Sequence, residues 1–334
     1  MLKFLSMNSQ IIIKLEQIRR GYLYLMSLKD RKVTSVNIYA TSRCNGRCRI
    51  CHIWKKKNNE DIALGTIKNI LKCENPGTQY FLSGGEFIMH PQYEEILNLF
   101  RDKNYILLSN GILSKRLLET VKKYKVRRVV LSFDGLGKTY AKVRGIDNFD
   151  NLHELIHQLN KICNVSLNYT INPLNDTFRE ISAANKFANE HRVYLALGIY
   201  DTPEYFDTSL SRTKLPSKLP KRPYPLNKYL TLYNKWLNGQ VKIPCLGIRN
   251  SCTVFPNGDV SLCYGKNIII GNIVKKSLKE IWESKKTQKK QDKYVTCTKC
   301  WLICQKPMDI FIWDIINLLP KRLIPANFKN ISEK

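Results

Sequence analysis

Short apolar runs alternate with amphipathic, helix-length segments between residues 33 and 205. The runs are rich in β-branched and aromatic residues, which favour strands. Six of them stand out: Val36–Ala40, Gln79–Ser83, Ile106–Ser109, Arg128–Phe133, Val165–Ile171 and Val193–Ile199. Segments long enough for crossover helices lie between them, among them Gln92–Lys103, Ser114–Tyr124, Phe149–Ile162 and Phe178–Glu190. This alternation predicts an α/β fold built on a parallel sheet.

Six strand–helix units are too few to close an eight-stranded barrel, so we expect an open, partial (β/α)6 barrel over residues 33–205. In such folds ligands bind at the carboxyl ends of the strands. The polar residues that directly follow each run are therefore the first candidates for function.

The regions on either side of this alternation have other patterns. Residues 1–32 predict an amphipathic helix that packs on the barrel or lies on a membrane surface. Residues 206–244 are rich in Pro and Lys and predict a basic linker or a substrate-facing loop. Residues 245–305 carry a second group of cysteines, and 306–334 form an apolar and basic tail that we expect to pack on the barrel.

A loop with three cysteines follows the first run. Cys44, Cys48 and Cys51 are separated by three and two residues, and Gly46 lets the loop curl between them. Three thiolates this close can converge on one metal centre, and a four-iron cluster held by three cysteines keeps one iron open for another ligand. Zinc with a fourth ligand from elsewhere in the chain is the alternative.

The Cys-x3-Cys-x2-Cys spacing after a first strand resembles the signature of the radical S-adenosylmethionine (SAM) enzymes. In that family the amino and carboxylate groups of SAM chelate the open iron. The resemblance implies that Cys44, Cys48 and Cys51 hold a [4Fe–4S] cluster that binds SAM. Ile50 stands where the family often has an aromatic residue, at a site that mainly contributes apolar cover.

Motifs at the ends of later strands extend the resemblance. Ser83-Gly84-Gly85-Glu86 resembles the family's Gly-Gly-Glu-Pro motif, although Phe87 replaces the proline. The third run ends in Ser109-Asn110, and the fourth in Ser132-Phe133-Asp134-Gly135, followed by Arg144-Gly145. The resemblance implies that SAM is bound by Gly84, Gly85, Glu86, Ser109, Asn110, Ser132, Asp134 and Arg144. For Arg144, fixing the loop is the alternative role, and each motif taken alone also suits an ordinary turn.

The second group of cysteines surrounds a predicted hairpin at 255–260. Cys245 and Cys263 flank that hairpin, and Cys297, Cys300 and Cys304 follow it. One thiolate pair on a hairpin and another in a Cys-x2-Cys can close a four-thiolate site, with a zinc ribbon as the alternative. Pro-Asn-Gly-Asp-Val-x2-Cys, Glu-Ile-Trp and the Cys-x2-Cys resemble the auxiliary SPASM/Twitch domains of radical SAM enzymes. This resemblance implies a second [4Fe–4S] cluster on Cys245, Cys263, Cys297 and Cys300, with Cys252 and Cys304 as alternates.

Composition constrains the compartment and the partners. The cysteines fall in clusters, and the first residues lack the continuous apolar segment of a signal peptide, so we expect a reducing, cytoplasmic compartment. The net charge is +28, from 55 Lys and Arg against 27 Asp and Glu. A charge of this size attracts nucleic acid, anionic lipid or acidic peptide, although the basic residues are dispersed. It predicts a solvated basic face or an anion-binding surface.

The family resemblance implies reductive cleavage of SAM and hydrogen abstraction from a substrate. Auxiliary domains of this kind make a peptide or protein our first hypothesis for the substrate, and a small sugar-like or lipid-linked molecule the second. An RNA substrate and a non-catalytic iron–sulfur or zinc protein complete the alternatives. The resemblance also implies an electron donor such as flavodoxin or ferredoxin, and peripheral membrane contact stays open.

Overall fold

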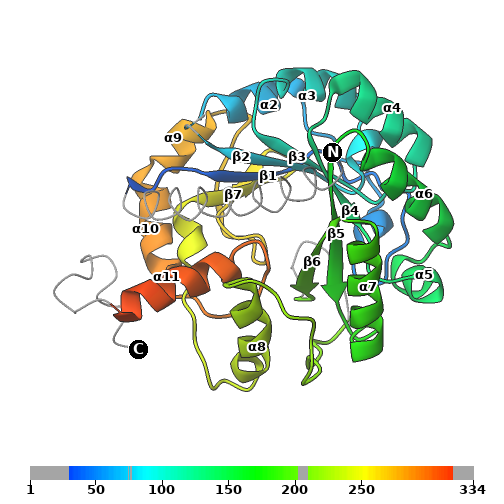
Figure 1. Ribbon diagram of the computed structural model, residues 1–334. Helices are drawn as coiled ribbons and strands as arrows, with labels where there is room; N and C mark the ends of the chain where they lie inside the picture. Colours follow the sequence, from blue (N-terminus) through cyan, green and yellow to red (C-terminus); the bar gives the residue numbers. More distant parts are fainter. Residues whose placement is uncertain (1–29, 74, 76, 202–209, 319–334) are drawn as a thin grey trace, which may run out of the picture.

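The computed structural model describes residues 30–318, except 74, 76 and 202–209. The amphipathic helix predicted for residues 1–32 lies almost wholly outside the described residues, as does the end of the tail. Nine strands form one curved sheet in the order β6-β5-β4-β3-β2-β1-β7-β8-β9 (Figure 1).

The first six strands are parallel to one another and form the partial barrel, which confirms the predicted fold class. They are β1 (Ser35–Tyr39), β2 (Gln79–Ser83), β3 (Tyr105–Ser109), β4 (Arg128–Ser132), β5 (Asn164–Ile171) and β6 (Tyr194–Ile199). The predicted and observed boundaries coincide at six of the twelve strand ends and differ by one residue at the other six, which is within the usual uncertainty of assigning the end of an element.

Helices cover the convex side of this sheet (Figure 1). They are α2 (Leu64–Leu71), α3 (Tyr93–Leu99), α4 (Ser114–Tyr124), α5 (Gly137–Arg144), α6 (Phe149–Leu159) and α7 (Phe178–Glu190). Alternate strand residues such as Ile38, Leu107 and Leu131 are fully buried. Because successive side chains point to opposite faces of a strand, one face forms the core with the helices and the other faces the open side of the barrel.

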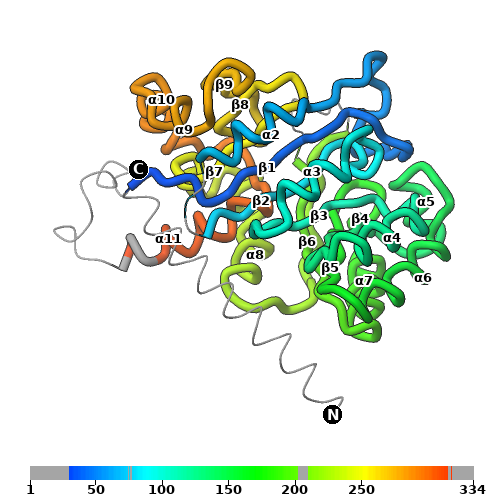
Figure 2. The backbone as a smooth tube through the Cα atoms, turned by 90° about the horizontal axis from the view of Figure 1, so that it is seen from above, coloured from blue at the N-terminus to red at the C-terminus, as the bar shows by residue number. Residues whose placement is uncertain are grey.

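The sheet continues past β1 into the second cysteine-bearing region. β7 (Ser251–Val254) pairs with β1 in parallel, and β8 (Asp259–Ser261) and β9 (Ile269–Asn272) add antiparallel strands. The turn between β7 and β8 is the predicted hairpin. Seen from above, β7–β9 with α9 (Leu278–Trp282) and α10 (Lys285–Tyr294) lie beside β1 and α2, away from α6 and α7 (Figure 2). The barrel and the cysteine-rich region therefore share one sheet.

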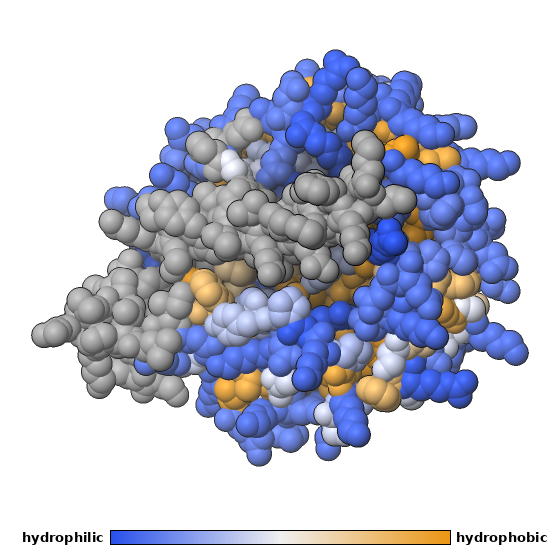
Figure 3. Space-filling view, viewed as in Figure 1, coloured by the Kyte–Doolittle hydropathy of each residue, from blue (hydrophilic) through white to orange (hydrophobic). Residues whose placement is uncertain are grey.

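Two helices close the remaining side. α8 (Leu226–Leu237) contacts α11 (Lys306–Leu318), and Trp301 stacks on Tyr229 of α8 at a centroid distance of 6.0 Å. Ile310 and Ile312 of α11 are buried, so the described part of the tail packs on the molecule as predicted. Across residues 30–318, where described, no helix combines the length and apolar character needed to cross a bilayer. Figure 3 shows a mainly hydrophilic outer rim, with hydrophobic residues gathered toward the middle of that face.

Among the described helices, α2, α5, α10 and α11 were not predicted as helices from the sequence. α2 and α5 are short, and α10 is so rich in lysine that it lacks an apolar stripe; only Thr287 and Gln291 of α10 are buried. His90 is buried, with 2% of its surface exposed. It follows the short 3-10 helix η2 (Phe87–Met89) and faces inward.

Candidate functional site

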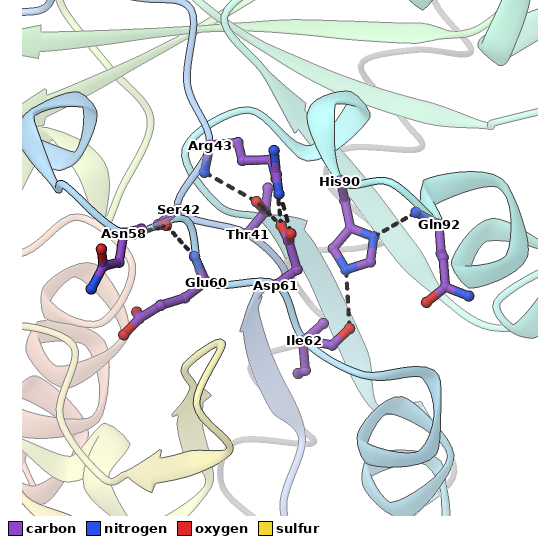
Figure 4. Close-up of polar contacts among 9 residues, drawn as sticks. All are labelled: Thr41, Ser42, Arg43, Asn58, Glu60, Asp61, Ile62, His90 and Gln92. Carbon is purple, nitrogen blue, oxygen red and sulfur yellow. Dashed lines mark hydrogen bonds and ion pairs between the residues drawn. The ribbon is translucent and has the colours of Figure 1, made fainter.

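The loop that carries Cys44, Cys48 and Cys51 is fastened at its start to the segment before α2 (Figure 4). The Thr41 hydroxyl donates to Asp61 Oδ1 at 2.5 Å, and the Arg43 guanidinium donates to Asp61 Oδ2 at 2.9 Å. Ser42 adds a backbone hydrogen bond to the Glu60 carbonyl at 2.9 Å. Asp61 therefore fixes the direction in which the chain leaves β1.

His90 holds this anchoring segment from the other side (Figure 4). The Gln92 N–H donates to His90 Nδ1 at 2.9 Å, so Nδ1 is an acceptor and Nε2 carries the proton. Nε2 lies 3.0 Å from the Ile62 carbonyl, to which it donates. Burial lowers the pKa of His90, which keeps the ring neutral. His90 is thus a structural residue behind the cysteine loop.

The three thiols of the loop share one small region. A Cβ placed on Gly46 would lie 3.4 Å from Cys48 Sγ and 3.6 Å from Cys44 Sγ, so both sulfurs flank this glycine. Burial raises the pKa of Cys44 to about 11 and that of Cys51 to about 12, and the charge of Cys48 adds to both. Thiolates so close and so poorly solvated are stabilised by a bound metal cation, so this donor set fits a cluster.

Gly84 and Gly85 lie against the backbone of the cysteine loop. A Cβ on Gly85 would lie 2.3 Å from the Arg43 carbonyl oxygen, and one on Gly84 would lie 2.6 Å from that of Thr41. The Gly85 N–H donates to the Thr41 carbonyl at 2.7 Å. The structure shows that the missing side chains of these glycines leave room for the backbone of the cysteine loop.

Glu86 is a buried carboxylate at the meeting point of β2 and β3. One oxygen accepts from the Ser109 hydroxyl at 3.0 Å and the other from the Asn110 N–H at 2.7 Å. Burial raises the pKa of Glu86 to about 7, against the effect of these hydrogen bonds. The Asn110 side chain donates to Asn45 Oδ1 at 2.8 Å and approaches Cys44 Sγ at 3.8 Å. The predicted residues at these two strand ends therefore meet the cysteine loop.

Asp134 and Arg144 form a buried ion pair, with Nη1 3.1 Å from Oδ2. The other oxygen of Asp134 accepts from the Thr170 N–H at 2.7 Å, which links β4 to β5. The Arg144 carbonyl accepts from the Arg47 N–H at 3.3 Å, so the end of α5 also holds the cysteine loop. Burial lowers the pKa of Arg144, but the charges of Cys48 and Asp134 raise it and prevail. Ser132 lies half-buried at the end of β4.

Sequence reasoning missed the residues that connect these motifs. Asn45, Thr170 and Asn175 each bond to a motif residue, and Asp61 bonds to Thr41 and Arg43 just before the cysteine loop. Asparagine and aspartate in loops are common, so only the tertiary fold assigns these partners. The polar residue Asn45 inside the cysteine loop was the one local signal available.

The second group of cysteines also converges. Cys245 precedes the 3-10 helix η4 (Leu246–Arg249), Cys263 follows β8, and the other three lie around the connection from α10 to α11. The pKa of Cys245 is raised chiefly by burial, and also by the charges of Asp309, Cys300 and Cys263. Burial also raises the pKa of Cys263, and the charge of Cys297 raises it further.

Cys252 belongs to a different environment. It lies on β7 and is buried, and burial raises its pKa, with Cys73 at the end of α2 as the next contribution. Cys252 thus interacts with Cys73, whereas the thiol of Cys304 interacts with those of Cys300 and Cys263.

The connection that carries Cys300 is tied to the barrel at the end of β6. The Trp301 N–H donates to Asp201 Oδ2 at 2.8 Å, and the Arg212 guanidinium donates to Asp201 Oδ1 at 2.7 Å. Tyr39, at the end of β1, shares a hydrogen bond of 2.6 Å with Tyr264, the neighbour of Cys263. Both groups of cysteines therefore lie at the carboxyl edge of the barrel.

Two family models match the chain. The radical SAM superfamily matches residues 38–184, and an iron–sulfur cluster-binding domain, SPASM, matches residues 245–301. Together with the fold, these matches place the chain in the radical SAM superfamily, with a SPASM domain after the barrel. This membership implies a [4Fe–4S] cluster and SAM in the first domain and further iron–sulfur binding in the second.

A probable GTP 3′,8-cyclase of Archaeoglobus fulgidus is 30% identical over 147 residues, which are 42% of this chain and 49% of that relative. The chain spans about half the length of the curated relatives it matches.

Among solved structures, Streptococcus suis SuiB superposes with a TM-score of 0.60 at 17% identity, covering 81% of this chain and 71% of SuiB. SuiB bound to its precursor peptide SuiA gives a TM-score of 0.58 at 18% identity, covering 81% and 70%. At this sequence identity the likeness concerns the fold alone.

Proposed function

We propose that the protein is an enzyme that cleaves SAM reductively at a cluster held by Cys44, Cys48 and Cys51. When bound and reduced, the cluster and SAM supply a 5′-deoxyadenosyl radical that removes a hydrogen atom from the substrate. The observation that carries the proposal is the convergence of strand-end motifs on one cysteine loop: Glu86 and Asn110 meet it from β2 and β3, and Arg144 from α5.

The chain's own residues would then orient SAM and hold the cysteine loop. We assign SAM binding to Gly84, Gly85, Glu86, Ser109, Asn110, Ser132, Asp134 and Arg144. Within this set, Glu86 is a buried carboxyl group whose pKa is raised by burial, and the positive charge of an ammonium group beside it would favour its ionised form. Arg144 places a positive charge beside Cys48 that favours the thiolate form. The close contact of Gly85 with the backbone of Arg43 holds the start of the loop in place.

We propose a peptide or protein as the substrate. The match to SPASM and the fold shared with SuiB, which is described as bound to a precursor peptide, support this choice. The second candidate is a small molecule, because the relatives at about 30% identity are named GTP 3′,8-cyclases. Those relatives match less than half of this chain. An electron donor such as flavodoxin or ferredoxin would reduce the first cluster.

We assign the auxiliary [4Fe–4S] cluster to four of the five converging thiols. Cys245, Cys263 and Cys300 interact with one another, and Cys297 with Cys263, which supports the set chosen from the sequence. Cys304 is the alternate fourth ligand, since its thiol interacts with those of Cys300 and Cys263. Cys252 is left out because its neighbour is Cys73.

Anaerobic reconstitution tests the proposal. The unaltered chain should bind about eight irons and, with dithionite and SAM, release 5′-deoxyadenosine. Cys48→Ala should keep about four irons and release no 5′-deoxyadenosine. Cys252→Ala, as the matched control, should behave like the unaltered chain. Cys297→Ala and Cys304→Ala identify the fourth auxiliary ligand, because only the variant that lacks the true ligand should lose the iron of the auxiliary cluster. SAM cleavage retained in Cys48→Ala would refute the assignment of the first cluster.

A further inference from the structure

A buried lysine lies beside the second group of cysteines. Lys306 begins α11 and is 1% exposed, and Asp309, one turn further on, is fully buried. Lys306 Nζ donates to the Ile243 carbonyl at 3.1 Å and lies 3.4 Å from Asp309 Oδ2. It also lies 5.8 Å from the centre of the Trp301 ring. Removing an ion pair from water is unfavourable, so a surface pair would stabilise the helix at less cost than this buried one.

The charge of Lys306 acts on two of the candidate ligands. Burial lowers its pKa, but Asp309, Cys245 and Cys300 raise it, and the net pKa is raised. In return, the pKa of Cys300 is raised to about 12 mainly by burial, and Lys306 is the strongest influence that lowers it. The geometry agrees: the ammonium is bound to the carbonyl of Ile243, two residues before Cys245, and lies 5.8 Å from the ring of Trp301, the residue after Cys300.

Asp309 binds the backbone of the segment that carries Cys245. Its Oδ1 accepts from the Leu246 N–H at 2.9 Å and from the Gly247 N–H at 3.1 Å, directly after the cysteine. Lys306 holds the same segment from the other side through the carbonyl of Ile243. For Cys245, apart from burial, the carboxylate of Asp309 is the strongest charge influence and opposes the thiolate. The pair therefore positions Cys245 while its two charges act in opposite directions.

We propose that Lys306 and Asp309 are positioning residues that set the midpoint potential of the auxiliary cluster. The ammonium stabilises the reduced, more negative cluster, chiefly through Cys300, and the carboxylate opposes it from the side of Cys245. An ammonium has three N–H donors, and Ile243 and Asp309 take two of them, which leaves one for a sulfur atom. Hydrogen bonds to sulfur and nearby charges are the usual protein influences on cluster potentials. This inference rests on the auxiliary cluster proposed above.

The test is an EPR-monitored redox titration of the reconstituted full-length chain. The auxiliary signal is identified as the one that persists in Cys48→Ala. Lys306→Met should make reduction about tenfold less favourable, which is a shift of about 59 mV to more negative potential. Asp309→Asn should shift the potential in the positive direction, since asparagine removes the charge but still accepts from Leu246 and Gly247. A merely structural role would not produce shifts of opposite sign.

Two further variants complete the design. Lys306→Arg keeps the charge and should restore most of the potential, which also covers the case that Lys306→Met fails to fold. Lys228→Met is the control: Lys228 lies on α8 and forms a more exposed ion pair with Asp314 of α11. Its loss should leave the potential unchanged. With about eight irons bound, equal or absent shifts in the Lys306 and Asp309 variants overturn this inference alone. Only about four irons in the unaltered chain would overturn the auxiliary cluster as well.

Discussion

The two groups of cysteines reach the same edge of the barrel by different means. Cys44, Cys48 and Cys51 lie on one loop, and their spacing already brings the sulfurs together. The second group is spread from Cys245 to Cys304 and converges only because β7 extends the sheet and α8 packs on the last connection. The first site therefore depends on local geometry, and the second depends on the completeness of the fold.

The largest expected effect breaks the first loop. In Gly85→Ala the new Cβ would lie 2.3 Å from the Arg43 carbonyl and 2.9 Å from Cys44 Cβ. Overpacking of this kind lowers the free energy of unfolding by roughly 1–3 kcal/mol or more. We expect urea unfolding to show that loss and iron counting to show loss of the first cluster, with the auxiliary iron kept.

Gly65 provides the matched control for this substitution. It lies in α2 with no atom within 4 Å of an added Cβ. Gly65→Ala should therefore raise the free energy of unfolding by about 0.5–1 kcal/mol, since glycine weakens a helix. A Gly85→Ala chain with normal iron content and stability would show that the contact between the two loops is dispensable.

The next effect is a pH dependence specific to the first site. The pKa of Glu86 is about 7 in the folded chain, above its usual value of 4.5. Between these two pH values the unfolded chain has lost this proton and the folded chain retains it, so stability falls as pH rises, by about 3 kcal/mol in all. Glu86→Gln should flatten this part of the profile in the metal-free chain, as measured by denaturant unfolding from pH 4.5 to 7. Parallel profiles for the two chains would contradict the assignment.

The smallest effect concerns the link between the two sites. Tyr264→Phe removes the hydrogen bond of 2.6 Å to Tyr39 and should lower the free energy of unfolding by about 1 kcal/mol. We expect both clusters to be retained, because neither tyrosine is among the candidate ligands. Loss of iron from only one site would show which group of cysteines depends on the contact.

The sequence was most informative where the chemistry is local. Cys44, Cys48 and Cys51 could be chosen from spacing, and Glu86 and Asp134 from their places after apolar runs. The partners that orient them, Asp61 and Thr170, could not, because their roles depend on which loops meet. Whether Cys252 or Cys304 replaces one of the four chosen ligands was open for the same reason: periodicity does not reveal that Cys252 on β7 interacts with Cys73.

The pairing of Ser35 on β1 with Ser251 on β7 also orders events during synthesis. β1 leaves the ribosome well before β7, and its outer edge keeps unpaired backbone groups until β7 emerges. Contacts between such distant segments form slowly. We therefore expect a nascent chain arrested before residue 251 to hold the cysteine loop on an unfinished sheet, so that stable loading of the first cluster follows translation of the C-terminal region.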